Sequence, residues 1–230
     1  MARILLVEDD TTVRETVAAY LTRAGHEVEA VADGEAGVAA YTAAPADLVL
    51  LDLMLPGLGG FEVTRRLRSM RRDLPLVMLT ARSQEHERVQ GLQHGADDYV
   101  TKPFSLRELD LRIRSVLRRA SAPPAEVAGV LRDGDLEVDL GARSATRAGE
   151  PLRLTARELD LLVWLVQHPG VVWSREALIG DVWGWEVGDA STVTVHVRRL
   201  REKVEPDPAA PSRLVTVFGR GYRWDAAEAG

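Results

Sequence analysis

The chain has 230 residues and a formal net charge of −6, and 46% of its residues are hydrophobic, which is enough to bury a sizeable core. It contains no cysteine, so disulfides, thiol catalysis and cysteine-based metal sites are excluded. No apolar run approaches the ~20 residues that a membrane span needs, and Glu8 interrupts the first one. We therefore expect no signal peptide, no membrane-spanning helix and a cytoplasmic location.

The first 120 residues alternate short apolar runs with amphipathic helical patterns, as in a doubly wound α/β domain with a five-stranded parallel sheet. The expected strands are residues 3–7, 27–31, 46–51, 75–79 and 98–100. The expected helices are residues 11–24, 34–42, 60–70, 84–94 and 105–119. This pattern predicts one domain over residues 1–120.

Residues 121–129 contain Pro123, Pro124 and small residues, which indicates a short linker. After it, residues 130–151 contain strand-like pieces separated by glycines, as in a small antiparallel sheet. Helical patterns follow over residues 156–167, 175–182 and 190–204, and a hairpin over 213–217 and 222–224 closes the chain. We expect an α+β winged helix-turn-helix domain over residues 130–226.

Polar side chains follow the predicted parallel strands at the points where the strands end. Glu8, Asp9 and Asp10 follow the first strand, Asp52 ends the third, Thr80 follows the fourth and Lys102 follows the fifth. The carboxyl ends of parallel strands share one edge of the sheet, so these groups are expected in one pocket. Asp10 is interpreted mainly as the cap of the first helix.

Clustered carboxylates repel one another, and a hard divalent cation such as Mg²⁺ relieves that repulsion. A carboxylate beside Mg²⁺ is able to attack phosphorus, and Lys102 would offset charge on the phosphoryl oxygens. Read one at a time, Glu8 and Asp9 are equally well explained as solvated loop acids. Lys102 is one of only two lysines among 29 basic residues, which favours a role that arginine cannot fill.

Four segments carry a family resemblance: Leu5–Asp10 (LLVEDD), Leu50–Gly57 (LLDLMLPG), Leu79–Arg82 (LTAR) and Gly95–Phe104 (GADDYVTKPF). Residues 3–119 resemble the receiver domain of two-component response regulators. The resemblance implies that Asp52 is the phospho-acceptor and that Asp9, Asp52 and the backbone carbonyl of Met54 bind Mg²⁺, with Glu8 nearby. It also implies a Lys102 contact to the phosphoryl group, a cis Lys102–Pro103 peptide, and Thr80 with Tyr99 as the switch pair.

One departure from the family lies in the segment Pro56-Gly57-Leu58-Gly59-Gly60. Family members often carry Asp or Ser before the glycine that opens the third helix. Glycine is a tolerable N-cap, so a change in loop flexibility is expected, with the chemistry unaffected.

Residues 84–119 resemble the OmpR/PhoB subfamily, whose receivers dimerise through the fourth helix, fifth strand and fifth helix. The resemblance suggests Arg88 with Glu108, and Asp97 or Asp98 with Arg112 or Arg119, across a two-fold axis. The apolar centre would be Val89, Leu92 and Leu111, with Leu111 in place of a common alanine. Ordinary solvated helix faces are the alternative, since exposed ion pairs contribute only ~0–1 kcal/mol each.

Neither half of the chain is basic: residues 1–120 carry 16 basic and 18 acidic residues, and residues 121–230 carry 13 and 17. DNA affinity therefore needs a local patch, and the helix at 190–204 supplies one, with Thr194, Arg198 and Arg201 on one face. A solvated basic face is the alternative interpretation.

The segments Leu154–Leu162, Val182–Gly184, Thr194–Leu200 and Gly219–Arg223 resemble the OmpR/PhoB winged-helix effector. The resemblance implies that 190–204 is the recognition helix. It also suggests which residues contact bases and which contact phosphates. Base contacts are expected from Thr194, Arg199 and Arg201; phosphate contacts from Trp183, Thr192, His196, Arg198 and Thr216; Lys203 and Arg220 complete the set. The wing departs from the family, which often has Arg at Phe218 and a small apolar residue at Arg220.

The expected protein is a response regulator and not an enzyme beyond its own phosphoryl uptake and loss. Its expected partners are a sensor histidine kinase, double-stranded DNA with direct-repeat half-sites, a second copy on phosphorylation and, as an open possibility, RNA polymerase. Two alternatives remain. A phosphatase would also use an aspartate and Mg²⁺, but commonly has a second Asp where Met54 stands. A DNA-binding protein independent of phosphorylation would not need the intact pocket.

Overall fold

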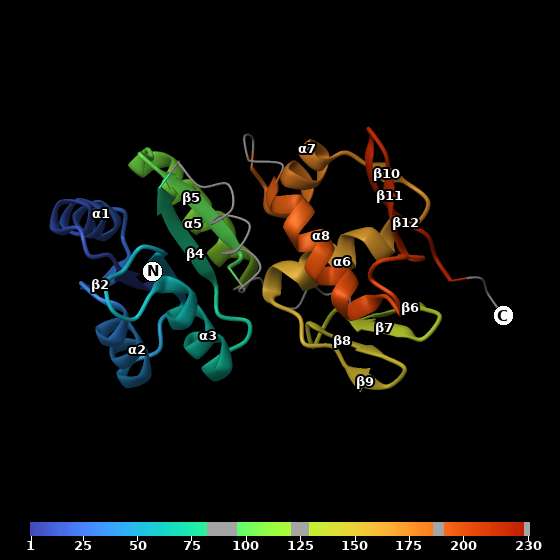
Figure 1. Ribbon diagram of the computed structural model, residues 1–230, viewed down its shortest axis with the longest axis horizontal. Helices are drawn as coiled ribbons and strands as arrows, with labels where there is room; N and C mark the ends of the chain where they lie inside the picture. The colour runs from blue at the N-terminus through green and yellow to red at the C-terminus, as the bar shows by residue number, and fades with distance from the viewer. Residues whose placement is uncertain (82–95, 121–128, 186–190, 228–230) are drawn as a thin grey trace. The chain divides into compact units, whose positions relative to one another are not determined.

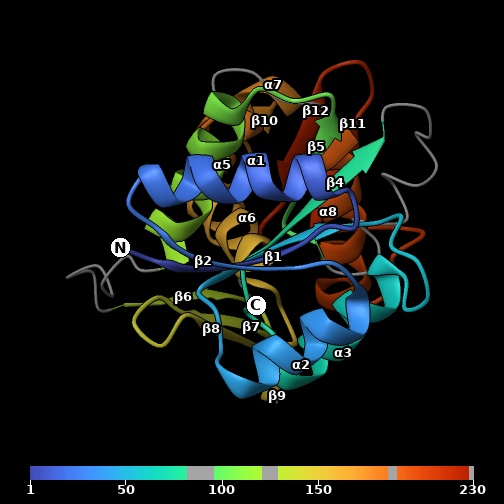
Figure 2. The same ribbon diagram turned by 90° about the vertical axis from the view of Figure 1, so that its left-hand side faces the viewer.

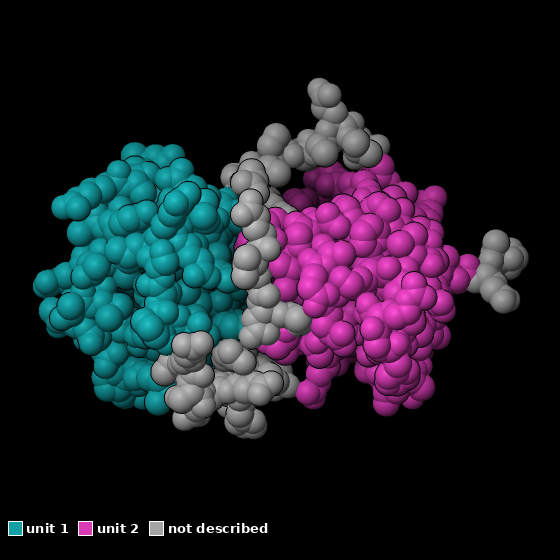
Figure 3. Space-filling view, turned by 90° about the horizontal axis from the view of Figure 1, so that it is seen from above, with its two compact units in different colours: residues 1–120 teal, residues 121–230 magenta. Residues whose placement is uncertain are grey.

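The computed structural model describes residues 1–81, 96–120, 129–185 and 191–227, without the side chains of residues 81 and 118–120. It divides into two compact units, Met1–Ala120 and Ser121–Gly230 (Figure 3). Among the described residues, none of the helices combines the length and the apolar character that crossing a bilayer requires.

The first unit is a five-stranded parallel sheet with helices on both faces. The sheet order is β2-β1-β3-β4-β5. This is the flavodoxin-like order, in which the direction of strand addition across the parallel sheet switches between β1 and β3. Its strands are β1 (Arg3–Val7), β2 (Glu27–Val31), β3 (Leu48–Asp52), β4 (Leu76–Ala81) and β5 (Asp98–Lys102). Its described helices are α1 (Thr11–Arg23), α2 (Gly34–Ala43), α3 (Gly60–Met70) and α5 (Leu106–Ala120).

The helices cover the two faces of this sheet in pairs, α1 and α5 on one side and α2 and α3 on the other (Figure 1, Figure 2). Because side chains alternate along a strand, Ile4 and Leu6 pack with Val17 and Ile113 in the core on the α1–α5 side. All five residues of β3 are buried, as expected for a central strand that is covered on both faces.

The second unit packs three helical segments between a small sheet and a hairpin sheet. The four-stranded antiparallel sheet contains β6 (Val130–Asp133), β7 (Leu136–Asp139), β8 (Ser144–Arg147) and β9 (Glu150–Pro151). The helices are α6 (Ala156–Gln167), α7 (Arg175–Leu178) continued by the π-helical turn η1 (Ile179–Trp183), and α8 (Ser191–Val204). The three-stranded sheet contains β10 (Val172–Trp173), β11 (Leu214–Val217) and β12 (Gly221–Trp224), in the order β10-β12-β11.

The expected fold class is confirmed, and the differences are local. The third strand begins at Leu48 and not at residue 46; just before it, the Asp47 side chain accepts a hydrogen bond from Arg3 N at 2.8 Å. The helix expected over 175–182 is α-helical only as far as Leu178 and then widens into η1. The helix expected over residues 84–94 lies outside the described residues.

Candidate functional site

The first candidate site lies at the carboxyl ends of β1 and β3, on either side of the point where the sheet order reverses. Glu8 and Asp52 are buried and Asp9 is exposed. Each of the three residues offers a carboxylate oxygen, and these oxygens lie within 4.8 Å of one another. Asp10 caps α1 by accepting a hydrogen bond from Val13 N at 3.0 Å, as expected. The sheet topology thus brings Asp52 next to Glu8 and Asp9, which lie 44 and 43 positions before it in the sequence.

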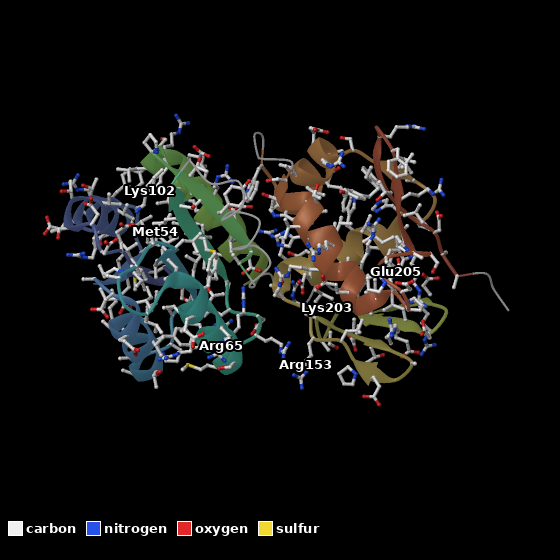
Figure 4. The ribbon with its side chains drawn as sticks, viewed as in Figure 1. Met54, Arg65, Lys102, Arg153, Lys203 and Glu205 are labelled. Atoms are coloured by element: carbon white, nitrogen blue, oxygen red, sulfur yellow. The ribbon has the colours of Figure 1, made fainter. Side chains whose placement is uncertain are left out.

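Lys102, the last residue of β5, joins this cluster from the far edge of the sheet (Figure 4). Its Nζ donates to Glu8 Oε1 at 2.7 Å and to Asp52 Oδ2 at 2.6 Å. The Lys102–Pro103 peptide is cis, as predicted. Burial lowers the pKa of Lys102, but the hydrogen bonds to Asp52 and Glu8 outweigh it, so the pKa lies above its usual value. The ammonium is therefore held charged beside the two carboxylates.

One lysine does not neutralise the whole cluster. Burial, together with the nearby charge of Asp52, raises the pKa of Glu8 to about 7, although the hydrogen bond from Lys102 acts in the opposite direction. Glu8 Oε2 is buried and has no hydrogen-bond partner among the described residues. Hard oxygen donors with uncompensated negative charge suit a divalent cation such as Mg²⁺, so the residues present fit the predicted ion.

The loop after β3 brings backbone groups to Asp52. Met54 N donates to Asp52 Oδ1 at 3.0 Å, while the Met54 side chain is exposed (Figure 4). Thr80, near the end of β4, is fully buried, and Tyr99 on β5 is 5% exposed. The role of Thr80 and Tyr99 as the switch pair stays a prediction.

Gly60, which the sequence suggested only as a helix start, is a spatial requirement of this site. A Cβ atom on Gly60 would lie 2.5 Å from the backbone oxygen of Asp52 and 2.8 Å from Leu53 Cα. The start of α3 therefore lies directly against the strand that carries Asp52, which only glycine permits. The run of glycines before α3 indicates a tightly packed loop, but the sequence does not show at which glycine a side chain is excluded.

The predicted dimer face is partly described. On α5, Arg112 pairs within its own chain with Asp98 at 3.3 Å and with Glu108 at 2.8 Å, and Leu111 is 58% exposed. Asp97 pairs instead with Arg68 of α3 at 2.7 Å and accepts from Leu76 N at 2.9 Å. Asp97 therefore has internal partners that the sequence did not suggest. The remaining candidates lie outside the described residues or side chains: Arg88, Val89, Leu92 and Arg119.

The second candidate site is the face of α8 that carries Thr194, Arg198 and Arg201. Thr194 and Arg198 are exposed. Arg201 donates to Leu214 O and to Thr216 Oγ1, both at 2.8 Å, so the helix is tied to the hairpin β11–β12. Burial of the guanidinium lowers the pKa of Arg201 from its usual value.

Other DNA-binding candidates have partners inside the second unit. Trp183 belongs to the hydrophobic core and packs edge to face against His196, with 5.2 Å between ring centroids. His196 Nδ1 lies 2.9 Å from Thr192 O, and both residues are buried. Arg199 pairs with Glu158 of α6 at 2.7 Å, and Lys203 contacts the same carboxylate. The sequence-based prediction gave Trp183 a phosphate contact. In the structure its indole is instead part of the hydrophobic core.

Comparison with known proteins gives the same division into two parts. Residues 4–114 match the family described as "Response regulator receiver domain", and residues 149–224 match "Transcriptional regulatory protein, C terminal".

Two relatives match nearly the whole of this chain. The chain is 46% identical to "Sensory transduction protein RegX3" of Mycobacterium tuberculosis over 225 residues, 97% of this chain and 99% of the relative. It is 45% identical to "DNA-binding response regulator MtrA" of Mycolicibacterium smegmatis over 222 residues, 96% of each chain. Among solved structures, that of a RitR mutant is similar with a TM-score of 0.78 and 25% identity, covering 99% of this chain and 100% of that chain. The chain therefore belongs to the two-component response regulators with a receiver domain and an OmpR/PhoB-type DNA-binding effector domain.

Proposed function

We propose that a sensor histidine kinase phosphorylates Asp52 in a Mg²⁺-dependent reaction, and that this modification controls dimerisation and sequence-specific DNA binding. The observation that carries the proposal is the contact of Lys102 with both Asp52 and Glu8 beside Asp9. A nucleophilic carboxylate, a cation and hard oxygen ligands thus meet at one edge of the sheet, as phosphoryl transfer requires.

The chemistry assigned to Asp52 is formation of an acyl phosphate. A carboxylate oxygen of Asp52 attacks the phosphorus of a phosphohistidine, the P–O bond forms, and the P–N bond to the imidazole breaks. Met54 N holds Oδ1 at 3.0 Å and Lys102 holds Oδ2 at 2.6 Å, so the carboxylate is oriented before the reaction. Glu8, Asp9, Asp52 and the Met54 carbonyl would hold Mg²⁺, which supplies positive charge to the phosphoryl oxygens.

The proposed output of the first domain runs through Thr80 and Tyr99 to the face formed by α5 and its neighbours. Thr80 donates to a phosphoryl oxygen and Tyr99 changes its packing in response. The pairs that Arg112 makes with Asp98 and Glu108 inside one chain then compete with pairs across a two-fold axis. Because Arg112 keeps a carboxylate partner in either arrangement, one phosphorylation has only to shift the balance between the two. The predicted contributions of Arg88, Val89, Leu92 and Arg119 remain part of this proposal.

The proposed DNA contacts come from side chains of α8 and of the hairpin β11–β12. Thr194 and Arg201 read the major groove, while Arg199, predicted as a third base contact, pairs with buried Glu158 and orients α8. Arg198, Thr216, Lys203 and Arg220 contact the sugar-phosphate backbone. Two copies would occupy direct-repeat half-sites about one helical turn apart. The domain boundaries that this proposal assumes are 1–120 and 130–226, with 121–129 as linker.

The test compares three full-length chains treated with a small-molecule phosphodonor and Mg²⁺: the wild type, Asp52→Asn and Asp10→Asn. Asparagine caps a helix as well as aspartate, so Asp10→Asn changes the charge beside the pocket without removing the acceptor. Mass spectrometry is expected to find one phosphoryl group on the wild type and on Asp10→Asn and none on Asp52→Asn. Selection of duplexes from a random pool is expected to recover a common site only with phosphorylated chains. Phosphorylation of Asp52→Asn, or equal DNA binding by treated and untreated wild type, would overturn the proposal.

A further inference from the structure

The tip of the hairpin β11–β12 carries a large apolar side chain in water. Phe218 is 92% exposed, and Arg220, two residues further, is also exposed. Between them Gly219 has φ +72°, and Arg220 N donates to Val217 O at 2.9 Å, which closes a tight turn. Positive φ at this position of a turn favours glycine. The turn therefore presents the phenyl ring and the guanidinium from a defined backbone.

This hairpin is held firmly to the rest of the second unit. Its strands pair from Leu214–Trp224 to Val217–Gly221, and β12 also pairs with β10. A Cβ on Gly221 would lie only 1.9 Å from the Trp173 carbonyl oxygen, so the hairpin base lies directly against β10. The tip projects from the edge of the unit (Figure 1, Figure 2).

The hairpin is also tied to the basic helix α8. Arg201 of α8 donates to Thr216 Oγ1 at 2.8 Å, and Tyr222 Oη donates to Thr194 Oγ1 at 3.3 Å. Thr216 lies two residues before Phe218, so the ring extends roughly 7 Å further along the hairpin at ~3.3 Å per residue. The hairpin tip is therefore held at a fixed position relative to α8 and to any duplex bound there.

We propose that Phe218 is an apolar wedge that enters the minor groove of a duplex bound to α8, partly unstacking one base step while Arg220 contacts a flanking phosphate. The inference rests on the proposed DNA-binding function and adds a contact that bends the DNA. Apolar side chains inserted from the minor groove kink duplexes by about 20–90°. Pyrimidine–purine steps unstack most easily, so the site is expected to contain such a step where the tip reaches, without a base-specific hydrogen bond there.

The experiment uses phosphorylated full-length chain and a duplex that the wild type selects from a random pool. The variants are Phe218→Ala, which removes the wedge, Phe218→Leu, which keeps an apolar wedge, and Arg220→Ala. Val171→Ala truncates another exposed apolar side chain of the same unit and serves as the matched control. Unchanged urea midpoints would show that each variant is folded. Affinity is measured over a range of salt concentrations, and the bend is measured by energy transfer between dyes at the two duplex ends.

Phe218→Ala is expected to lose the bend and to bind about tenfold more weakly, with the salt dependence unchanged because no ion pair is lost. Phe218→Leu is expected to keep most of the bend, and Val171→Ala to behave as the wild type. Arg220→Ala is expected to lower the salt slope by about one phosphate contact. Replacing the pyrimidine–purine step is expected to weaken the wild type but not Phe218→Ala.

Three results would overturn the inference. The first is wild-type bending and affinity in Phe218→Ala. The second is that Phe218→Ala loses cooperative binding to paired half-sites but still binds a single half-site as the wild type does. That result would place Phe218 against a second copy of the chain. The third is that the phosphorylated wild type selects no duplex. That last result removes the proposed DNA-binding function as well, whereas the first two leave it standing.

Discussion

The carboxylate of Glu158 holds the second domain together at three points, which makes it the sharpest test of how this domain is stabilised. The side chain is fully buried, and its Oε2 accepts from Thr155 N at 2.8 Å to complete the capping box of α6. The same carboxylate pairs with Arg199 at 2.7 Å and contacts Lys203, both on α8. Glu158→Gln keeps an oxygen for Thr155 N but removes the charge that faces the two cations.

The cost of this substitution follows from the burial of the partners. Removing one partner of a buried ion pair costs about 3–5 kcal/mol. The Arg199 side chain is only 9% exposed but that of Lys203 is 25% exposed, so water offsets part of the loss. We therefore expect Glu158→Gln to lower the free energy of unfolding of the second domain by about 3 kcal/mol. Glu158→Ala also loses the cap and is expected to cost about 1 kcal/mol more.

The pH dependence has a defined sign. Burial alone would raise the pKa of Glu158, but the charges of Arg199 and Lys203 outweigh it, and the pKa lies below its ordinary value. A carboxylate with a depressed pKa in the folded state contributes its stability above the unfolded pKa and loses it as the pH falls through the folded pKa. The difference between wild type and Glu158→Gln should therefore be constant above about pH 5 and shrink below about pH 4.5.

The assay is urea unfolding of the full chain followed by tryptophan fluorescence. All five tryptophans, Trp164, Trp173, Trp183, Trp185 and Trp224, lie in the second unit, so the signal reports that unit alone. Glu202→Gln is the control, since Glu202 forms an exposed pair with Arg198 on the same helix at 3.4 Å and should cost less than about 1 kcal/mol. Equal midpoints for Glu158→Gln and Glu202→Gln would refute the reasoning, as would a difference that grows at acid pH.

Two further outcomes test the pocket and the hairpin. Lys102→Ala should lower the melting temperature of the first domain in calorimetry without Mg²⁺, because the carboxylates of Glu8 and Asp52 lose their shared cation. Saturating Mg²⁺ should restore the melting temperature, because an ion at 100 times its Kd adds about 2.7 kcal/mol of stability. The Asp9→Asn variant should gain little from Mg²⁺. Equal Mg²⁺ effects on Lys102→Ala and Asp9→Asn would contradict the assignment of Asp9 as a Mg²⁺ ligand. Gly221→Ala should cost more than about 2 kcal/mol, since φ is +142° and the new Cβ would meet Trp173 O at 1.9 Å. Gly219→Ala has open space around it and should cost about 1–2 kcal/mol from its φ of +72° alone; the reverse order in urea unfolding would show that backbone crowding is misjudged.

Local sequence signals determined the order of elements and their approximate ends. The alternation of apolar runs with helical periods predicts the parallel sheet, because a strand buried on both faces is mostly apolar, as β3 is from Leu48 to Leu51. Side chains that bond to their own neighbouring backbone were equally predictable, since Asp10 and Thr155 each cap a helix through the residue three positions further on. The strand-end positions of Glu8, Asp52 and Lys102 predict one pocket because parallel strands end at one edge.

Only the tertiary structure decided how charges and close approaches are shared between distant segments. Nothing in the sequence pairs Asp97 with Arg68 or Arg199 with Glu158, because many arginines and carboxylates are available and their partners depend on helix packing. The same holds for Gly60 and Gly221, whose missing side chains matter only because another backbone lies within 2.5 and 1.9 Å of where a Cβ would be. Exposure is likewise a tertiary property: Trp183 is in the core and Phe218 is in water. Their hydrophobicity would have suggested the same place for both, and only packing separates them.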